Sequence, residues 1–482
     1  MTHSSAVFGP ARRIGTLSFL LLITVSVSTF AQDRLDPVAM GMGRSATAFS
    51  RGLGALLTNP GGLGYHPLGR SSQAHDLVFS VYSGGGSIGG TYLAGDEFSQ
   101  IFGEGAGQTD ESRERIGELL VDERLFANGG INFLTGLWRL PNGGGTLGLH
   151  YGSRAYARVN FPDGLARLIA TSNIADKDFR FVNRGIGATW FTEFGLSYGR
   201  VFGDQSARGW LPSFGLGLSG RLIGGVVHFD VTENSALFID QINVDGRLQF
   251  LVRGGYTFRS AEPDAFDQDG AVGNFLSNPF PSTAGLGIAT DVGVNGVLYR
   301  GEKRSVHYGM VFANLGRITW TNKARERRGS NFSDTLGASL GEAEFERFEG
   351  DLVTVEDYST TLPSTFRGGL GLSIHPSGEG EPATLLIGLE GELPLNQVPG
   401  NTPDPRISAG VDWTAAEKFS LRGGISVGGI SEVGIGLGVG IRPTDWMSID
   451  LGTSELNGLF SGDRLDFAGR ISFGITPGQT TE

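Results

Sequence analysis

The sequence contains no cysteine among its 482 residues. This absence excludes disulfides and thiolate metal sites, so packing and hydrogen bonds must hold the fold together. Charged residues are also sparse, at 18% of the chain, and acidic residues outnumber basic ones. The resulting formal net charge of -12 argues against nucleic acid as a partner.

Long apolar runs are missing as well. Beyond residue 31 the chain has no uncharged hydrophobic stretch of the roughly 20 residues that a spanning helix needs. The first 31 residues differ, because two arginines at 12 and 13 precede an apolar stretch over 14–27 and a small-x-small cleavage signal ends at Ala31. We therefore expect residues 1–31 to be a signal peptide and the protein to be exported.

Glycine is abundant, with 79 residues in the chain, about twice the share found in average proteins. Many glycines alternate with large apolar residues. Between 432 and 442, five aliphatic residues occupy every second position and glycines occupy four positions between them. A strand would place all five aliphatic side chains on one face, whereas a helix would spread them around its circumference.

The same period of two recurs along the chain with charged residues on the second face. The charged residues expected to face the lumen of a barrel are Arg221, Asp291, Arg367, Glu390, Glu392, Asp412, Arg422, Asp450 and Arg470. Their mixed signs predict salt bridges within the lumen rather than an ion-selective pore, and buried charges need such partners in any case.

The alternating segments are about 9–11 residues long, which suits a tilted membrane-spanning strand. They predict an all-β fold, a transmembrane antiparallel β-barrel of roughly 14 strands (12–16), over residues 67–476. A soluble β-sandwich would alternate similarly, but the export signal, the number of segments and the glycine content favour the barrel. Residues 477–482 form a C-terminal tail.

Several connections between the predicted strands are long. Amphipathic patterns predict helices in extracellular loops near 110–126 and 163–174, and the polar stretches 260–282 and 323–362 are expected to be loops. The acidic residues within 342–351 are interpreted as a solvated loop face rather than a cation site.

Residues 32–66 do not alternate. Their small residues are compatible with one or two short helices, and the Asn59-Pro60 step predicts the turn that ends them. We interpret this segment as a plug, or hatch, within the barrel.

Motifs for enzymatic chemistry lack their structural context. Gly-x-Ser-x-Gly occurs at Ser87, Ser197 and Ser426, yet no strand-turn-helix pattern surrounds these serines. The dinucleotide-like pattern that starts at Gly41 lacks a preceding strand. The histidines are not at metal-ligand spacing. We therefore expect no catalytic residues, no metal and no cofactor.

The N-terminal stretch nevertheless carries a family pattern. The matching residues are Gly41, Gly43, Ala46 and Ala48, followed by Asn59, Pro60, Gly62 and Leu63. This stretch resembles the beginning of the FadL-like long-chain fatty acid transporters and of related outer-membrane barrels, which include type IX secretion shuttle proteins and uncharacterised Bacteroidota-type relatives. Gly61 departs from the pattern, which has alanine there. The segments 314–320 and 362–369 also look like parts of the uncharacterised relatives.

The resemblance implies a bacterial outer-membrane barrel whose N-terminal segment is a lumenal hatch, with Gly41, Gly43, Ala46, Asn59, Pro60 and Gly62 as gating residues. One hypothesis is passive uptake of hydrophobic, fatty-acid-like molecules by a monomer that is surrounded by outer-membrane lipid. The other is a non-enzymatic structural or secretion-partner barrel whose loops dock another protein. A transporter should copurify with a hydrophobic ligand, and a docking barrel with another polypeptide.

Overall fold

The computed structural model describes residues 36–66, 68, 76–90, 115–118, 120, 124–160, 179–182, 185–232, 235–244, 247–264, 279–336, 351–375, 384–401, 404–416, 418–429, 433–461 and 464–475. The predicted signal peptide 1–31, the predicted helix 163–174 and the tail 477–482 lie outside this part of the chain. Within it, no helix is both long enough and apolar enough to cross a membrane.

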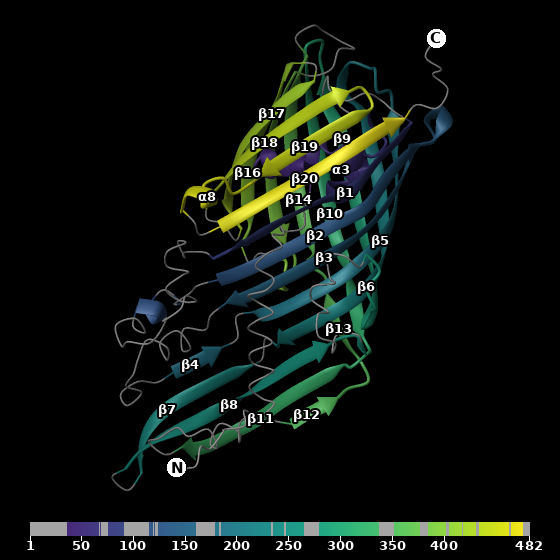
Figure 1. The fold of residues 1–482 in the computed structure, drawn as a ribbon. Helices are drawn as coiled ribbons and strands as arrows, with labels where there is room; N and C mark the ends of the chain where they lie inside the picture. The colour runs from purple at the N-terminus through teal and green to yellow at the C-terminus, as the bar shows by residue number, and fades with distance from the viewer. Residues whose placement is uncertain are drawn as a thin grey trace, which may run out of the picture.

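Fourteen of the described strands form a closed antiparallel barrel (Figure 1). They are β1 (Leu77–Gly89), β2 (Arg124–Arg139), β3 (Thr146–Asn160), β5 (Ile186–Gly203), β6 (Gly209–Val231), β9 (Gly285–Arg300), β10 (Arg304–Trp320), β14 (Thr365–Ile374), β15 (Leu385–Pro394), β16 (Arg406–Ala416), β17 (Phe419–Gly428), β18 (Val433–Thr444), β19 (Met447–Thr453) and β20 (Arg464–Ile475). Each strand pairs with the next in this order. The last strand pairs with the first, with Leu77 opposite Ile475. The prediction of a barrel of about 14 strands is confirmed.

The alternation in the sequence explains the two faces of the wall. In β18, Val433, Ile435 and Leu437 are exposed on the outside, and the glycines between them are buried inside. The same outward aliphatic face recurs around the barrel, for example at Leu218, Ile288 and Leu389. This continuous apolar surface is what a barrel presents to lipid.

Six further strands lie outside the barrel proper. They are β4 (Phe179–Val182), β7 (Ala236–Val244), β8 (Arg247–Ala261), β11 (Arg325–Leu336), β12 (Asp351–Thr354) and β13 (Tyr358–Thr361). The first five form a projecting sheet that joins the barrel where β8 pairs with the end of β6. The sixth, β13, pairs with the end of β10.

The structure corrects three predictions about loops and strand lengths. Residues 323–362 are not one long loop, because they contain β11, β12 and β13. Two barrel strands are longer than the predicted 9–11 residues, since β5 has 18 residues and β6 has 23. A sheet outside the lipid belt needs no continuous apolar face, so its strands give a weak alternating signal. The predicted helix 110–126 is also too long: residues 115–118 are helical, but β2 begins at Arg124.

The two ends of the barrel differ. Strands at one end are joined by short connections, such as the turn with η4 (Pro141–Gly143) and those at 204–208, 301–303 and 445–446. We call this the short-turn end, and it is uppermost in Figure 1. The projecting sheet and α8 (Gly458–Ser461) lie toward the opposite, long-loop end.

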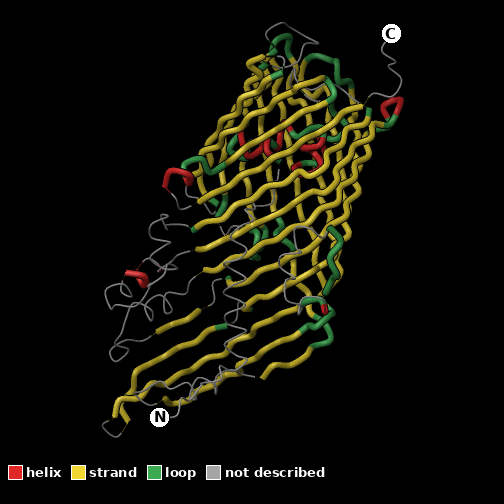
Figure 2. Tube along the Cα trace, in the orientation of Figure 1, coloured by secondary structure: helices red, strands yellow, loops and turns green. Residues whose placement is uncertain are grey.

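Residues 36–66, here called the lumenal segment, lie inside the barrel toward its short-turn end (Figure 2). They contain α2 (Pro37–Gly41), η2 (Thr47–Phe49), α3 (Leu53–Thr58) and η3 (Pro60–Gly62). These four short elements contact thirteen strands of the barrel between them, and Met42 lies against the fourteenth, β16, at Gly410. The segment therefore crosses the whole lumen.

Candidate functional site

The lumenal segment approaches the wall at backbone distance. A Cβ atom added to Gly41 would lie 2.8 Å from the Cα of Gly438, and one added to Gly61 would lie 2.7 Å from the carbonyl carbon of Gly293. Gly43 has a φ of +60°, and its Cβ would lie 2.7 Å from the amide nitrogen of Ile425. Glycine on both surfaces thus lets the two backbones touch.

The turn at Asn59 and Pro60 is fixed to the wall. The Asn59 side chain accepts a hydrogen bond of 3.0 Å from the Gly61 amide and donates one of 2.9 Å to the carbonyl of Val294. Pro60 begins the short helix η3, where a missing N–H costs nothing. The buried Ala46 precedes η2, and Gly62 packs on the backbone of Ser50. Whether these residues gate anything stays a prediction.

Alternating charges connect the start of the lumenal segment to the wall. Arg470 of β20 binds Asp36 at 2.6 Å and Asp450 of β19 at 3.4 Å. Arg422 of β17 binds the same Asp450 and also Asp412 of β16, both at 2.9 Å. These five buried residues are here called the charge ladder, and their two arginines and three aspartates leave one net negative charge.

A second buried network, here called the Glu193 cluster, occupies the opposite wall. Glu193 of β5 binds Arg154 and Arg221, each at 2.9 Å. Arg221 continues to Asp291 at 2.7 Å, and His150 lies 3.6 Å from the Glu193 carboxylate. Four neighbouring strands, β3, β5, β6 and β9, therefore contribute to one charge-balanced group.

The remaining lumenal charges that the sequence indicated also face inward. Arg367 donates to the carbonyl of Thr58 at 2.8 Å, and Glu390 accepts from the amide of Thr47 at 2.8 Å. Glu392 pairs with Arg406 at 2.8 Å. The structure thus places all nine predicted residues on the inner wall: six in the two networks, Arg367 and Glu390 against the lumenal segment, and Glu392 in a separate pair with Arg406.

Sequence reasoning missed Asp36, His150, Arg154 and Glu193 of these networks, and also Arg44, which pairs with the wall separately. Arg154 and Glu193 occupy inward positions of alternating strands and could have been found by the same period of two. Arg44 has a φ of +71° and reaches Asp466 of β20 at 3.4 Å, which no local pattern indicates.

The two later family-like segments meet at one bulge. Asn314 has a φ of +58°, at a register shift where β10 leaves β14 and begins to pair with β13. Its amide donates to Asp291 at 2.6 Å, and its side chain donates to the carbonyl of Pro363 at 3.1 Å. Ser364 returns a hydrogen bond of 2.7 Å to the Asn314 carbonyl. The bulge therefore orients the Glu193 cluster.

Along β3, β5, β6, β9 and β10 the inner wall is layered. Glycines that contact the lumenal segment come first, counted from the short-turn end: Gly148, Gly199, Gly217, Gly293 and Gly309. The Glu193 cluster forms the next layer. An apolar cluster follows toward the long-loop end, and its larger members are Tyr156, Phe191, Ile223, Trp320, Tyr358 and Leu362. The inner wall, which is otherwise polar, thus carries buried aromatic rings on the long-loop side of the Glu193 cluster.

A short segment, 395–401, covers this apolar cluster. It connects β15 to β16, yet its carbonyls at Gln397 and Asn401 accept hydrogen bonds of 3.0 and 3.3 Å from Arg158 of β3, on the other side of the barrel. Gly400 lies against the ring of Tyr156. Asn396 donates to the carbonyl of Leu362 at 2.6 Å. The segment therefore spans the lumen on the long-loop side of the apolar cluster.

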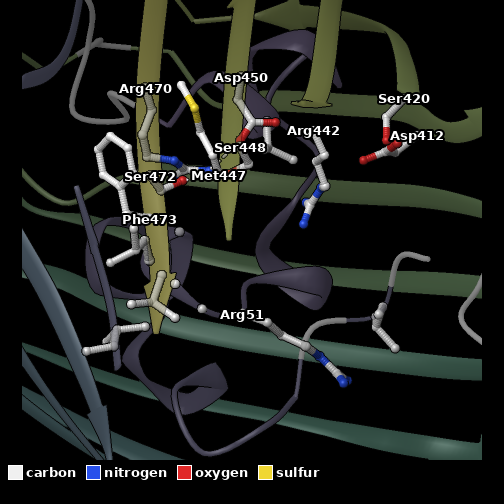
Figure 3. A pocket seen from close by; sticks show the side chains of 18 of the residues that line it. Arg51, Asp412, Ser420, Arg442, Met447, Ser448, Asp450, Arg470, Ser472 and Phe473 are labelled. Atoms are coloured by element: carbon white, nitrogen blue, oxygen red, sulfur yellow. Dashed lines mark hydrogen bonds and ion pairs between the residues drawn. The ribbon is translucent and has the colours of Figure 1, made fainter. Parts of the chain in front are cut away.

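A cavity of about 190 Å³ lies on the short-turn side of the lumenal segment (Figure 3). Arg51 of the lumenal segment, Arg139 of β2 and Arg442 of β18 line it, together with the turn residues Asp445 and Trp446. In Figure 3 the side chains of Arg51 and Arg442 point into its open space. Apolar residues complete the lining, among them Leu53 and Phe473.

Catalytic or metal chemistry finds no support among the described residues. Ser87, Ser197 and Ser426 all lie within strands, β1, β5 and β17, rather than at the strand-to-helix turn that a nucleophile elbow requires. No group of three His, Asp or Glu side chains in this part of the chain could hold a metal ion.

One ion pair of the projecting sheet is partly exposed. Arg328 donates two hydrogen bonds of 3.0 Å to Glu326. These hydrogen bonds hold the pKa of the Glu326 carboxyl below its usual range. The pair is largely exposed on the Arg328 side, so its contribution to stability is small.

Comparison with known proteins gives one sequence match and several structural ones. The model of a family described as "Family of unknown function (DUF5723)" matches residues 81–448. No curated protein matches the chain. Among solved structures, the Ralstonia pickettii toluene transporter TbuX is 10% identical with a TM-score of 0.43, over 92% of this chain and 99% of its own. The P. putida toluene transporter TodX is 9% identical, with a TM-score of 0.42 and coverage of 92% and 99%. A Pseudomonas aeruginosa FadL homologue is 9% identical, with a TM-score of 0.40 and coverage of 92% and 98%. At these scores the likeness does not indicate what this chain carries.

Proposed function

Because the chain belongs to the DUF5723 family, whose function is unknown, we propose a function from its lumen: passive uptake of hydrophobic small molecules across a bacterial outer membrane. The lumenal segment acts as the hatch, and the short-turn end faces the periplasm. The apolar outer surface and the closed ring of strands support a membrane-spanning barrel.

The apolar cluster carries this proposal. Trp320 is fully buried, stacks on His228 at 5.2 Å and donates its indole N–H to Thr360 at 2.8 Å. When segment 395–401, which covers these buried rings, moves aside, the rings give an apolar solute a surface on which to leave water.

The layers toward the periplasm dictate the rest of the mechanism. A solute on the apolar cluster meets the Glu193 cluster and then the lumenal segment, so it cannot pass straight through the resting structure. It must move when the lumenal segment shifts, or leave sideways through the wall. The charge ladder holds the segment in place, because breaking one pair leaves a buried carboxylate without its partner.

Uptake by intact cells tests the proposal. We expect Trp320→Ala to lower the initial uptake rate of a radiolabelled long-chain fatty acid or polycyclic hydrocarbon by about tenfold, through the loss of aromatic contacts. Trp138→Ala is the matched control, because Trp138 is 55% exposed on the outside of β2. Uptake by the parent protein no faster than in cells without it, or equal rates for both variants, would refute the proposal.

The projecting sheet favours a second candidate function, that of a barrel that docks another protein. Strands β4, β7, β8, β11 and β12 extend beyond the wall and are not needed to close it. If this function is the correct one, a polypeptide will copurify with the barrel, and removal of the sheet will release that polypeptide without changing hydrocarbon uptake.

A further inference from the structure

The arginines that face the lumen differ in whether a carboxylate pairs with them. Arg154, Arg221, Arg406, Arg422 and Arg470 each have a carboxylate oxygen at 2.6–2.9 Å. Five arginines line the short-turn cavity, and three of them, Arg51, Arg139 and Arg442, form no ion pair with a carboxylate among the described residues.

The neutral contacts of these three arginines show the imbalance. Arg51 donates to the carbonyl of His66 at 3.0 Å, and Arg139 contacts the His66 ring nitrogen at 2.7 Å, so both guanidinium groups converge on one residue. Arg51 also lies over the ring of Tyr65, 4.5 Å from its centre. The Arg442 guanidinium has no hydrogen-bond or ion-pair partner in the described part of the chain.

The three aspartates that line the cavity offset its five arginines only in part. Asp412 and Asp450 belong to the charge ladder and are already bound by Arg422 and Arg470. Asp445 sits in the β18–β19 turn at the rim. Cations partly removed from water without counterions are costly, and a protein retains them where a ligand supplies the negative charge.

We propose that the short-turn cavity is an oxyanion site, which binds a carboxylate or phosphate group between Arg51, Arg139 and Arg442. Guanidinium groups match such oxygens in planar, bidentate geometry. The hydroxyls of Ser420, Ser448 and Ser472 can complete the hydrogen bonding, and Leu53 and Phe473 accommodate a short apolar body. The volume suits a small molecule or a headgroup rather than a drug-sized ligand. The site does not depend on the uptake proposed above.

Calorimetry on the purified barrel, in a nonionic detergent at low chloride, tests this site. The probes are inorganic phosphate and hexanoate, with 1-hexanol as the uncharged counterpart of hexanoate, and vesicles of phosphatidylglycerol provide a lipid headgroup. We expect saturable binding of an anion and none of hexanol. Arg442→Gln and Arg139→Gln should each weaken anion binding by about tenfold.

The control variant is Arg304→Gln, which removes an exposed arginine at the same end, at the start of β10. It should bind as the parent does. Heat-modifiable gel migration verifies that each variant is folded, and two lumenal variants guard against the failure of one. Binding of phosphate or hexanoate assigns the site to a soluble anion, and binding of phosphatidylglycerol alone assigns it to a lipid headgroup. No binding of any probe, or unchanged affinity in both folded lumenal variants, would overturn the proposal.

Discussion

Glycine does two separate jobs in the lumenal segment, and two residues distinguish them. Gly43 and Gly52 both have a positive φ, of +60° and +58°. Only Gly43 is also in backbone contact, because a Cβ at Gly52 would meet nothing within 4 Å. Strain and close approach can therefore be measured independently.

We predict that Gly52→Ala costs about 1–3 kcal/mol, the strain of a side chain at a φ of +58° and a ψ of -144°. Gly43→Ala should cost clearly more, since its methyl group would also push the segment away from Ile425. Urea unfolding measures the stability, and entry of a small sugar into liposomes reports displacement of the segment. Equal effects of the two variants would show that backbone contact with the wall is unimportant.

The strands of the wall and the four short helical elements of the lumenal segment differ in what stabilises them. Pairing of the wall is continuous without the lumenal segment, and each of the fourteen strands has two neighbours in the wall. The four short helical elements, in contrast, have few contacts with one another and rely on the wall. The segment should thus be separable from the barrel.

Deletion of residues 32–64, with the signal retained, is predicted to give a folded barrel with raised permeability to small solutes. Liposome swelling measures the permeability, and circular dichroism checks the strand content. The control keeps the lumenal segment and carries Arg317→Gln at an exposed site on β10. This variant should remain impermeable. A correctly folded deletion variant with unchanged permeability would refute the plug.

At the scale of the whole molecule, the wall is uneven. Strands β5, β6, β9 and β10 have 16–23 residues, and strands β14–β20 have 7–12. The projecting sheet continues the tall side (Figure 1). The uptake proposal requires this sheet to be outside the cell and the short turns to be in the periplasm.

The absence of cysteine makes this orientation testable. Thr354→Cys lies on the exposed strand β12, and Glu302→Cys lies in the exposed β9–β10 turn. An impermeant maleimide added to intact cells should label the first variant only, and lysed cells should label both. The reverse labelling pattern would show that the barrel has the opposite orientation, and it would contradict the uptake proposal.

The sequence by itself determined the wall, because a period of two is a local property: each residue shows its face by comparison with its own neighbours. Val433 to Ile441 and the nine charged lumenal residues could be assigned in this way. The projecting strand Arg325–Leu336 could not, since outside lipid it carries no apolar face. Only the tertiary structure decided which charges meet. Asp36 and Arg470 are separated by 434 positions, and the Glu193 cluster draws on four strands. The lack of carboxylate partners at Arg51 and Arg139 shows only in space. A charge pattern along one strand says which way a side chain points, but the closure of the barrel sets what stands opposite.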